Sequence, residues 1–292
     1  MVAPSQADWW KGPFFLTTLH SLTPSWQPSD WEKNVYPAGD WALEERATPR
    51  MVMGRDSRIL WADGESLVIV ADTGYGKSSL SNNIVQAGIG LADDVLGFEV
   101  RRFERVLYIA ADRPMQTRYN LRRMITEDTR EYWNEHVHIH DGPLPFYLNE
   151  KPEYMGMFAK MTREKWGAKP ADCVIIDSLM NVATGLSDDE EGIKVNAALQ
   201  AVCREGIQLL VTHHPRKGQS MRGKKGDDNM PTLDDVFGSK FITGGAGSVI
   251  YLHNHDIIDG SLEVTHLKSP AGPVDFHRIC FENETGKVQW VL

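Results

Sequence analysis

The chain has 292 residues, of which 41% are hydrophobic and 24% are charged, and this composition excludes a chain that is disordered throughout. The formal net charge of -9 argues against a protein that coats nucleic acid by bulk electrostatic attraction, although a local basic surface remains possible. Three cysteines lie far apart without a C-x-x-C pair, and no apolar run approaches the ~20 residues of a membrane span. We therefore expect a cytoplasmic protein with reduced thiols and no membrane partner.

Residues 1–58 form a segment rich in tryptophan and proline, with Trp9, Trp26 and Trp41 spread along it. The prolines interrupt every helical or strand-like period, so we expect an irregular N-terminal arm. Tryptophan side chains are large apolar anchors, which suggests that the arm docks on a protein surface. The sequence leaves open whether that surface belongs to the same chain or to a neighbouring subunit.

From residue 59 to residue 292 the pattern is regular, because short apolar runs alternate with helix-length segments. The runs are residues 67–70, 106–110, 174–176, 209–211 and 248–252. This alternation is typical of βαβ units and predicts a doubly wound, mostly parallel α/β sheet. Residues 260–292 carry strand and turn signals with little helix, so the sheet should end in antiparallel strands.

A glycine-containing loop follows the first of these runs. The stretch VIVADTGYGKSSL, residues 68–80, matches the phosphate-binding pattern G-x-x-x-x-G-K-[ST] at Gly76, Lys77 and Ser78, with Ala71 in the leading position. Alanine is the least bulky substitute for glycine, and the loop has the required strand before it and helix after it. The residues expected to hold ATP are Ala71, Asp72, Thr73, Gly74, Tyr75, Gly76, Lys77, Ser78 and Ser79.

Two side chains of this loop have distinct expected roles. The Lys77 ammonium should reach the β- and γ-phosphates, and the Ser78 hydroxyl should bind Mg²⁺. A P-loop enzyme also needs a carboxylate at the end of a neighbouring strand to hold the water shell of Mg²⁺, and ADCVIIDSLMNV supplies it as Asp177. The sequence therefore predicts an ATP site in which Ser78 and Asp177 hold the metal.

Polar residues also follow two other strand-like runs. Asp112 follows RVLYIAA and should emerge at the same sheet edge as the P-loop, which makes it a candidate base that orients the attacking water. The alternative is that Asp112 caps the helix after Pro114. The run IQLLVTHHPRKG ends in two histidines, of which we expect His213 to contact the γ-phosphate. A packed or solvent-facing pair is the alternative.

Residues 216–225 form a basic segment directly after these histidines. It carries no acidic residue, and its positive charges are Arg216, Lys217, Arg222, Lys224 and Lys225. Such a segment would neutralise DNA phosphates and give binding that weakens steeply with salt. The alternative is a solvated loop, since Asp227 and Asp228 follow at once. The acidic stretch TGLSDDEEGIKV is interpreted instead as a helix N-terminus.

With these pieces in order, the chain resembles the RecA-like P-loop ATPases of the hexameric DnaB and RepA helicase branch, especially the helicase-like AAA ATPases of actinobacteria and their phages. The resemblance covers about residues 59–292 and rests on LWADGESLVIVADTGYGKSSL, RVLYIAADRP, DCVIIDS, VTHHPRKG and VFGSKFITGGAGSVIYL. It implies a RecA fold, ATP hydrolysis between the subunits of a ring, and single-stranded DNA in the central channel.

The resemblance also implies roles for single residues. Asp112 stands where the family usually has a catalytic glutamate, Tyr119 stands where RecA stacks an aromatic ring on adenine, and Lys268 lies near the family's trans-acting lysine. No arginine follows Lys268 at the usual spacing, so the arginine finger is unassigned. The positions that match the P-loop pair, the metal carboxylate and the sensor are Lys77, Ser78, Asp177 and His213.

These observations predict an ATP-hydrolysing, ring-forming motor, hexameric by resemblance, that acts on single-stranded DNA as a helicase or a helicase-like factor of replication or recombination. One alternative is a nucleotide-dependent assembly or regulatory ATPase without strand separation, which the short Asp112 side chain and the net acidity favour. Another is a recombinase that coats DNA as a filament.

Overall fold

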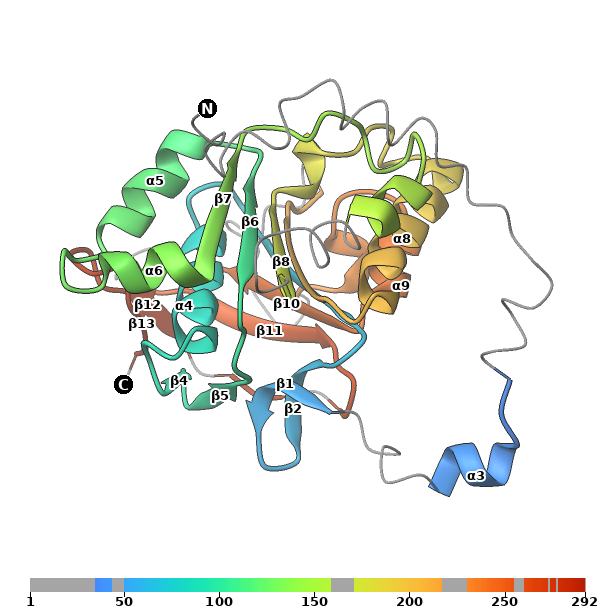
Figure 1. Ribbon diagram of the computed structural model, residues 1–292, viewed down its shortest axis with the longest axis horizontal. Helices are drawn as coiled ribbons and strands as arrows, with labels where there is room; N and C mark the ends of the chain where they lie inside the picture. Colours follow the sequence, from blue (N-terminus) through green and yellow to red (C-terminus); the bar gives the residue numbers. More distant parts are fainter. Residues whose placement is uncertain are drawn as a thin grey trace, which may run out of the picture. The chain divides into compact units, whose positions relative to one another are not determined.

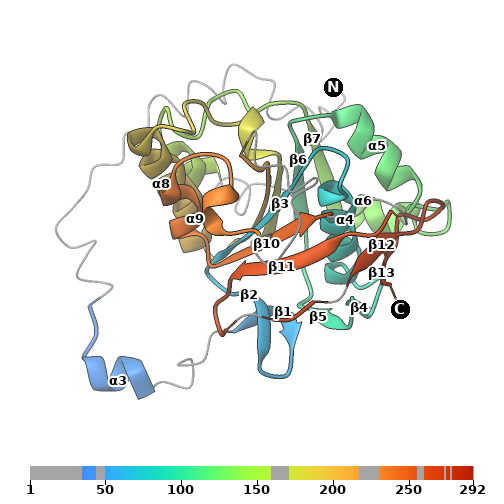
Figure 2. The same cartoon turned by 180° about the vertical axis from the view of Figure 1, so that it is seen from behind.

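A seven-stranded sheet organises the chain from Pro49 onward, in the order β11-β10-β3-β9-β8-β6-β7 (Figure 1, Figure 2). The strands are β3 (Ser66–Ala71), β6 (Val106–Ala110), β7 (Val137–Asp141), β8 (Cys173–Asp177), β9 (Gln208–His213), β10 (Ser248–His253) and β11 (Glu263–Lys268). Neighbours from β10 to β7 run parallel, whereas β11 pairs antiparallel with β10. The predicted fold class is thereby confirmed.

This computed structural model describes residues 35–43, 50–158, 171–216, 230–254, 260–272, 274–276 and 278–291. The chain divides into two units, residues 1–48 and residues 49–292. In the first unit the described helix α3 (Ala38–Leu43) has no buried residue. In the second unit the hairpin of β1 (Met51–Arg55) and β2 (Arg58–Ala62) precedes β3, so regular structure begins before residue 59. The rest of the predicted arm lies outside the described residues.

Helices cover both faces of the sheet, which explains why its central strands are buried along their whole length. One face carries α4 (Lys77–Gly88), α5 (Pro114–Arg122) and α6 (Arg130–His136), and the other carries α8 (Asp189–Arg204) and α9 (Lys240–Gly245) (Figure 1). The short helices η1 (Leu179–Asn181) and η3 (Leu233–Asp235) lie in connections. Within the described part of the chain, no helix is long and apolar enough to cross a membrane.

Two small sheets flank the central one. The first has the order β2-β1-β5-β4 and includes β4 (Asp94–Val95) and β5 (Phe98–Val100). The second is the C-terminal hairpin of β12 (Ile279–Phe281) and β13 (Val288–Trp290). Asn83 of α4 holds this hairpin, because its Nδ2 donates to the Gly286 carbonyl at 2.9 Å and its Oδ1 accepts from the Val288 amide at 3.1 Å. The hairpin therefore packs on the helix that follows the glycine-containing loop.

The parallel strands end at one edge of the sheet, and their register sets which side chains meet there. Ala110 pairs with Asp177, and Val70 pairs with His213. Residues that follow β3, β6, β8 and β9 therefore share this carboxyl edge, where α/β sheets place their ligands.

Candidate functional site

The loop between β3 and α4 has the backbone that its glycines permit. Gly74 has φ +87° and Gly76 has φ +79°, and Gly76 is the N-cap of α4. A Cβ at Gly76 would come closer than 3.0 Å to the Phe281 ring of the C-terminal hairpin, so packing as well as backbone conformation requires glycine. Ala71 is the buried last residue of β3, and extended backbone accommodates any L residue. An alanine in the leading position is therefore compatible with the loop.

Lys77 is the first residue of α4, and its side chain is buried against the preceding loop. Its Nζ donates to the carbonyls of Ala71 at 2.7 Å and Asp72 at 3.1 Å. Burial lowers the pKa of Lys77 to about 8, although the charges of Asp177 and Asp112 oppose that shift. The ammonium thus sits at the N-terminus of α4, where helix dipole and backbone N–H groups favour an anion.

Three hydroxyl groups converge on Asp177, the last residue of β8, which is 5% exposed. Its Oδ2 accepts from Ser78 Oγ at 2.6 Å and from the Tyr108 hydroxyl at 2.9 Å, and its Oδ1 accepts from Thr212 Oγ1 at 2.5 Å. Ser78 and Asp177 are hard oxygen donors beside a phosphate-type loop, and this donor set fits Mg²⁺. The structure thus brings together the two residues that the sequence assigned to the metal. Tyr108 and Thr212 were not expected from the sequence, where only strand alternation could have indicated them.

A cavity of about 370 Å³ opens above these groups. Its lining comes from the loop, from α5 with the residues before it, and from the ends of two strands, namely Thr73, Gly74, Gly76, Lys77, Ser78, Ser79, Asp112, Arg113, Gln116, Thr117, Tyr119, Asn120, Arg123, Asp177 and His214. Of the predicted ATP-binding residues, Ala71 is buried in β3, Asp72 offers its carbonyl to Lys77, and Tyr75 packs against the core. The other predicted loop residues line the cavity.

The α5 side of the cavity holds Asp112 and Tyr119. The Asp112 amide donates to the Asp177 carbonyl at 3.0 Å, which places Asp112 beside Asp177. The N-cap of α5 is Arg113, so Asp112 is not the cap that the alternative reading required. Tyr119 is 59% exposed, and the Arg123 guanidinium lies 5.5 Å from the centre of its ring. Tyr119 is therefore an exposed aromatic ring in the cavity lining, with Arg123 over one of its faces.

The two histidines at the end of β9 have exchanged their expected positions. His214 lines the cavity, whereas His213 is fully buried and its Nε2 donates to the Phe237 carbonyl at 2.7 Å. Successive strand residues face opposite sides, and Thr212 already faces Asp177, so His213 must face the other side of the sheet. Burial lowers the pKa of His213 to about 4, which keeps the ring neutral. His213, which we expected to contact the γ-phosphate, therefore lies away from the cavity, and His214 is the histidine that lines it.

Lys268 lies away from the cavity of its own chain. Its Nζ donates to the carbonyls of Gly244 at 2.6 Å and Thr243 at 3.3 Å, at the end of α9. Lys268 also pairs with Val249 near the start of β10, which is the opposite edge of the sheet from the P-loop. Lys268 is therefore not part of the cavity of its own chain.

The basic segment is described only at its first residue. Arg216 follows β9, and its guanidinium donates to the Gly238 carbonyl at 3.3 Å. The other predicted DNA-binding residues lie outside the described residues, namely Lys217, Arg222, Lys224 and Lys225.

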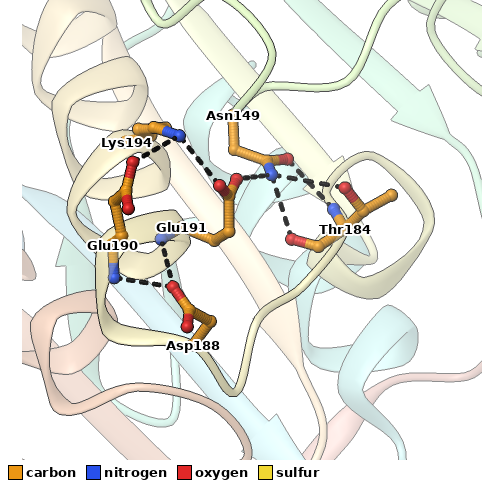
Figure 3. A network of polar contacts seen from close by, with 6 residues as sticks. All are labelled: Asn149, Thr184, Asp188, Glu190, Glu191 and Lys194. Carbon is orange, nitrogen blue, oxygen red and sulfur yellow. Dashed lines mark hydrogen bonds and ion pairs between the residues drawn. The ribbon is translucent and has the colours of Figure 1, made fainter.

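The acidic stretch after Asp177 forms a helix N-terminus, as the sequence predicted. Asp188 is the N-cap of α8, and its Oδ1 accepts from the amides of Glu190 at 2.8 Å and Glu191 at 3.1 Å (Figure 3). Asn149 Nδ2 donates to the Thr184 carbonyl at 3.1 Å and to the Glu191 carboxylate (Figure 3). This network anchors the connection between β8 and α8 to the loop that follows β7.

Comparisons with known proteins agree with this geometry. The family model described as "AAA domain" matches residues 37–220. One solved structure, described as an ATPase domain, is 16% identical with a TM-score of 0.54, and the match covers 78% of this chain and 85% of that chain. A DnaB-like replicative helicase, solved for its interactions with primase, is 16% identical with a TM-score of 0.61 over 90% of this chain and 70% of that chain. At such identity these structures share the fold with this chain. No curated protein sequence matches the chain.

Proposed function

Because the chain belongs to the AAA domain family and has a RecA-like P-loop ATPase fold, we propose that it hydrolyses ATP in this cavity as a ring-forming motor on single-stranded DNA. The contact between Ser78 and Asp177 carries the proposal. This contact joins the P-loop hydroxyl to the carboxylate at the end of β8. Both groups line the same cavity as Lys77. Phosphoryl transfer needs this grouping, because catalysis rests on positioning and on neutralising the charge of the phosphates.

The loop residues bind the triphosphate. Backbone N–H groups of the loop and the N-terminus of α4 would hold phosphate oxygens, and Lys77 would exchange its two carbonyl contacts for the β- and γ-phosphates. Ser78 and Asp177 would hold Mg²⁺, which would supply positive charge that neutralises the phosphates. Ser78 donates through its hydroxyl hydrogen to Asp177, so its oxygen would still have lone pairs with which to bind a metal.

The α5 side of the cavity would supply the remaining roles. Asp112 would orient the attacking water and accept its proton, from a position beside Asp177. Tyr119 would stack on the adenine ring at the cavity mouth. His214, rather than His213, would contact the γ-phosphate and respond to its loss. Arg216 follows His214 after one residue, so a change there would pass directly into the basic segment.

The position of Lys268 and the charge of the basic segment support action in a ring. A residue at the far edge of the sheet cannot reach its own γ-phosphate, so a role for Lys268 in hydrolysis requires a neighbouring subunit. Residues 216–225 would contact DNA phosphates. The carboxylate of Asp112 is one methylene shorter than the glutamate usual in such helicases. That observation favours, as a second candidate, an assembly or regulatory ATPase that hydrolyses ATP slowly and separates no strands.

A strand-displacement assay with ATP separates these two functions when it is run beside an ATPase assay. For the motor, we expect DNA-stimulated hydrolysis and unwinding in the wild type, and neither activity in Lys77→Ala. DNA-stimulated hydrolysis without unwinding would contradict the helicase and support the regulatory ATPase. Electron micrographs with ATP and single-stranded DNA would distinguish rings from the filaments of a recombinase.

A further inference from the structure

The hydroxyl groups around Asp177 come from two kinds of element. Ser78 belongs to α4, the helix that follows the P-loop. Tyr108 and Thr212 belong to β6 and β9, the strands on either side of β8, and both are buried. Asp177 is therefore held on both oxygens by the sheet itself, independently of the loop.

Tyr108 has a polar atom where packing alone would call for none. Val106, Tyr108 and Ala110 alternate on the face of β6 that joins the apolar core beneath α4. A phenylalanine would fill the same space, and the hydroxyl meets Asp177 Oδ2 at 2.9 Å. A phenol donates through its hydroxyl hydrogen, so Tyr108 is the donor and the Asp177 carboxylate is the acceptor.

Thr212 completes the arrangement from the other side. Its Oγ1 lies 2.5 Å from Asp177 Oδ1, which is short for a hydroxyl donor and typical of a hydrogen bond to a carboxylate. The two donors fix the rotation of the carboxylate about its Cβ–Cγ bond, because each holds a different oxygen. With Ser78 and Tyr108 both donating to Oδ2, one lone pair of Oδ1 remains for the water shell of a metal beside Ser78.

We propose that Tyr108 and Thr212 are positioning residues that orient Asp177 for the Mg²⁺ of the nucleotide site. This inference rests on the proposed ATPase function. It assigns the strength of metal binding partly to two side chains that touch neither metal nor nucleotide. Partners of this kind change metal affinity by roughly 10- to 100-fold when they are removed.

The test measures metal binding directly. Mn²⁺ would be titrated by electron paramagnetic resonance in the presence of a non-hydrolysable ATP analogue, with wild type, Tyr108→Phe, Thr212→Val and Thr212→Ser. We expect Tyr108→Phe and Thr212→Val to weaken Mn²⁺ binding about tenfold. Thr212→Ser keeps the hydroxyl and should restore most of the affinity. Binding of the analogue without metal should be unchanged in all four proteins.

A matched control uses a tyrosine that bonds a neutral acceptor. The Tyr132 hydroxyl donates to the Ile89 carbonyl at 2.6 Å, so Tyr132→Phe removes a part-buried hydroxyl without touching Asp177. Its Mn²⁺ affinity should match that of the wild type, and the melting temperatures of the variants show whether packing has changed. If Tyr108→Phe unfolds the chain, the comparison of Thr212→Val with Thr212→Ser decides.

Two results would overturn the proposal. One is a change of less than about twofold in Mn²⁺ affinity in both Tyr108→Phe and Thr212→Val. The other is a wild-type protein that binds no Mn²⁺ with the analogue. Failure of the proposed function can be distinguished from failure of this inference. A wild type that binds Mn²⁺ and the analogue but hydrolyses no ATP would refute hydrolysis. The comparison of Mn²⁺ affinities would still decide on Tyr108 and Thr212.

Discussion

Gly76 is constrained by its own backbone conformation and by the C-terminal hairpin that packs on it. The substitution Gly76→Ala should reveal both constraints. The φ of +79° costs an alanine roughly 1–2 kcal/mol. The added Cβ would also come closer than 3.0 Å to the Phe281 ring, and such overpacking costs roughly 1–3 kcal/mol. We therefore expect Gly76→Ala to lower the free energy of unfolding by about 2–5 kcal/mol before any nucleotide is present.

Gly74 supplies the matched control, because its φ is +87° but nothing lies within 4 Å of an added Cβ. Gly74→Ala should cost only the backbone part, about 1–2 kcal/mol. Urea unfolding of the nucleotide-free protein measures these changes, and a double-mutant cycle with Phe281→Ala isolates the steric part. In the Phe281→Ala background, Gly76→Ala should cost no more than Gly74→Ala. A coupling energy below about 0.5 kcal/mol would refute the reasoning.

Further predictions concern Lys77, the histidine pair and the basic segment. Because burial lowers the pKa of Lys77 to about 8, the stability of the free protein should rise with pH between about 8 and 10.5, where only the unfolded chain keeps that proton. Lys77 should take up a proton when ATP binds near pH 9, whereas Lys77→Arg should take up none. Calorimetry in two buffers measures this proton uptake, and equal uptake in both proteins would contradict the expectation. His213→Ala should lower the free energy of unfolding by about 2–4 kcal/mol and leave KM for ATP unchanged. His214→Ala should change turnover and have little effect on stability. The reverse pattern would return the sensor role to His213. Replacing Lys224 and Lys225 by glutamate should lower the salt slope of single-stranded DNA binding by about 1.4, and an unchanged slope would exclude the loop from DNA contact.

Local patterns were sufficient for the fold and for the centre of the site. Apolar runs separated by helix-length segments predicted the parallel sheet, and the loop's spacing predicted where β3 ends and α4 begins. Asp177 was predicted because it ends such a run, and in a parallel sheet every strand brings its carboxyl end to the same edge. These features depend on residues close in sequence or on a rule common to all parallel sheets.

Contacts between distant segments were beyond the reach of the sequence. Nothing in the loop's own residues indicates that Phe281 packs on Gly76, because more than two hundred positions separate them. The hydroxyls of Tyr108 and Thr212 meet Asp177 only because β6 and β9 are its neighbours in the sheet. Strand order is a property of the assembled sheet, so no single run of residues encodes it.

The histidine pair His213 and His214 shows what the sequence indicates and what only the tertiary structure decides. The sequence by itself indicated that only one of the two histidines could face the carboxyl edge of the sheet where the P-loop lies, because successive strand side chains point to opposite sides. Only the tertiary structure decided which one. Thr212 already occupies the face toward Asp177, so His213 turns into the core and His214 reaches the cavity.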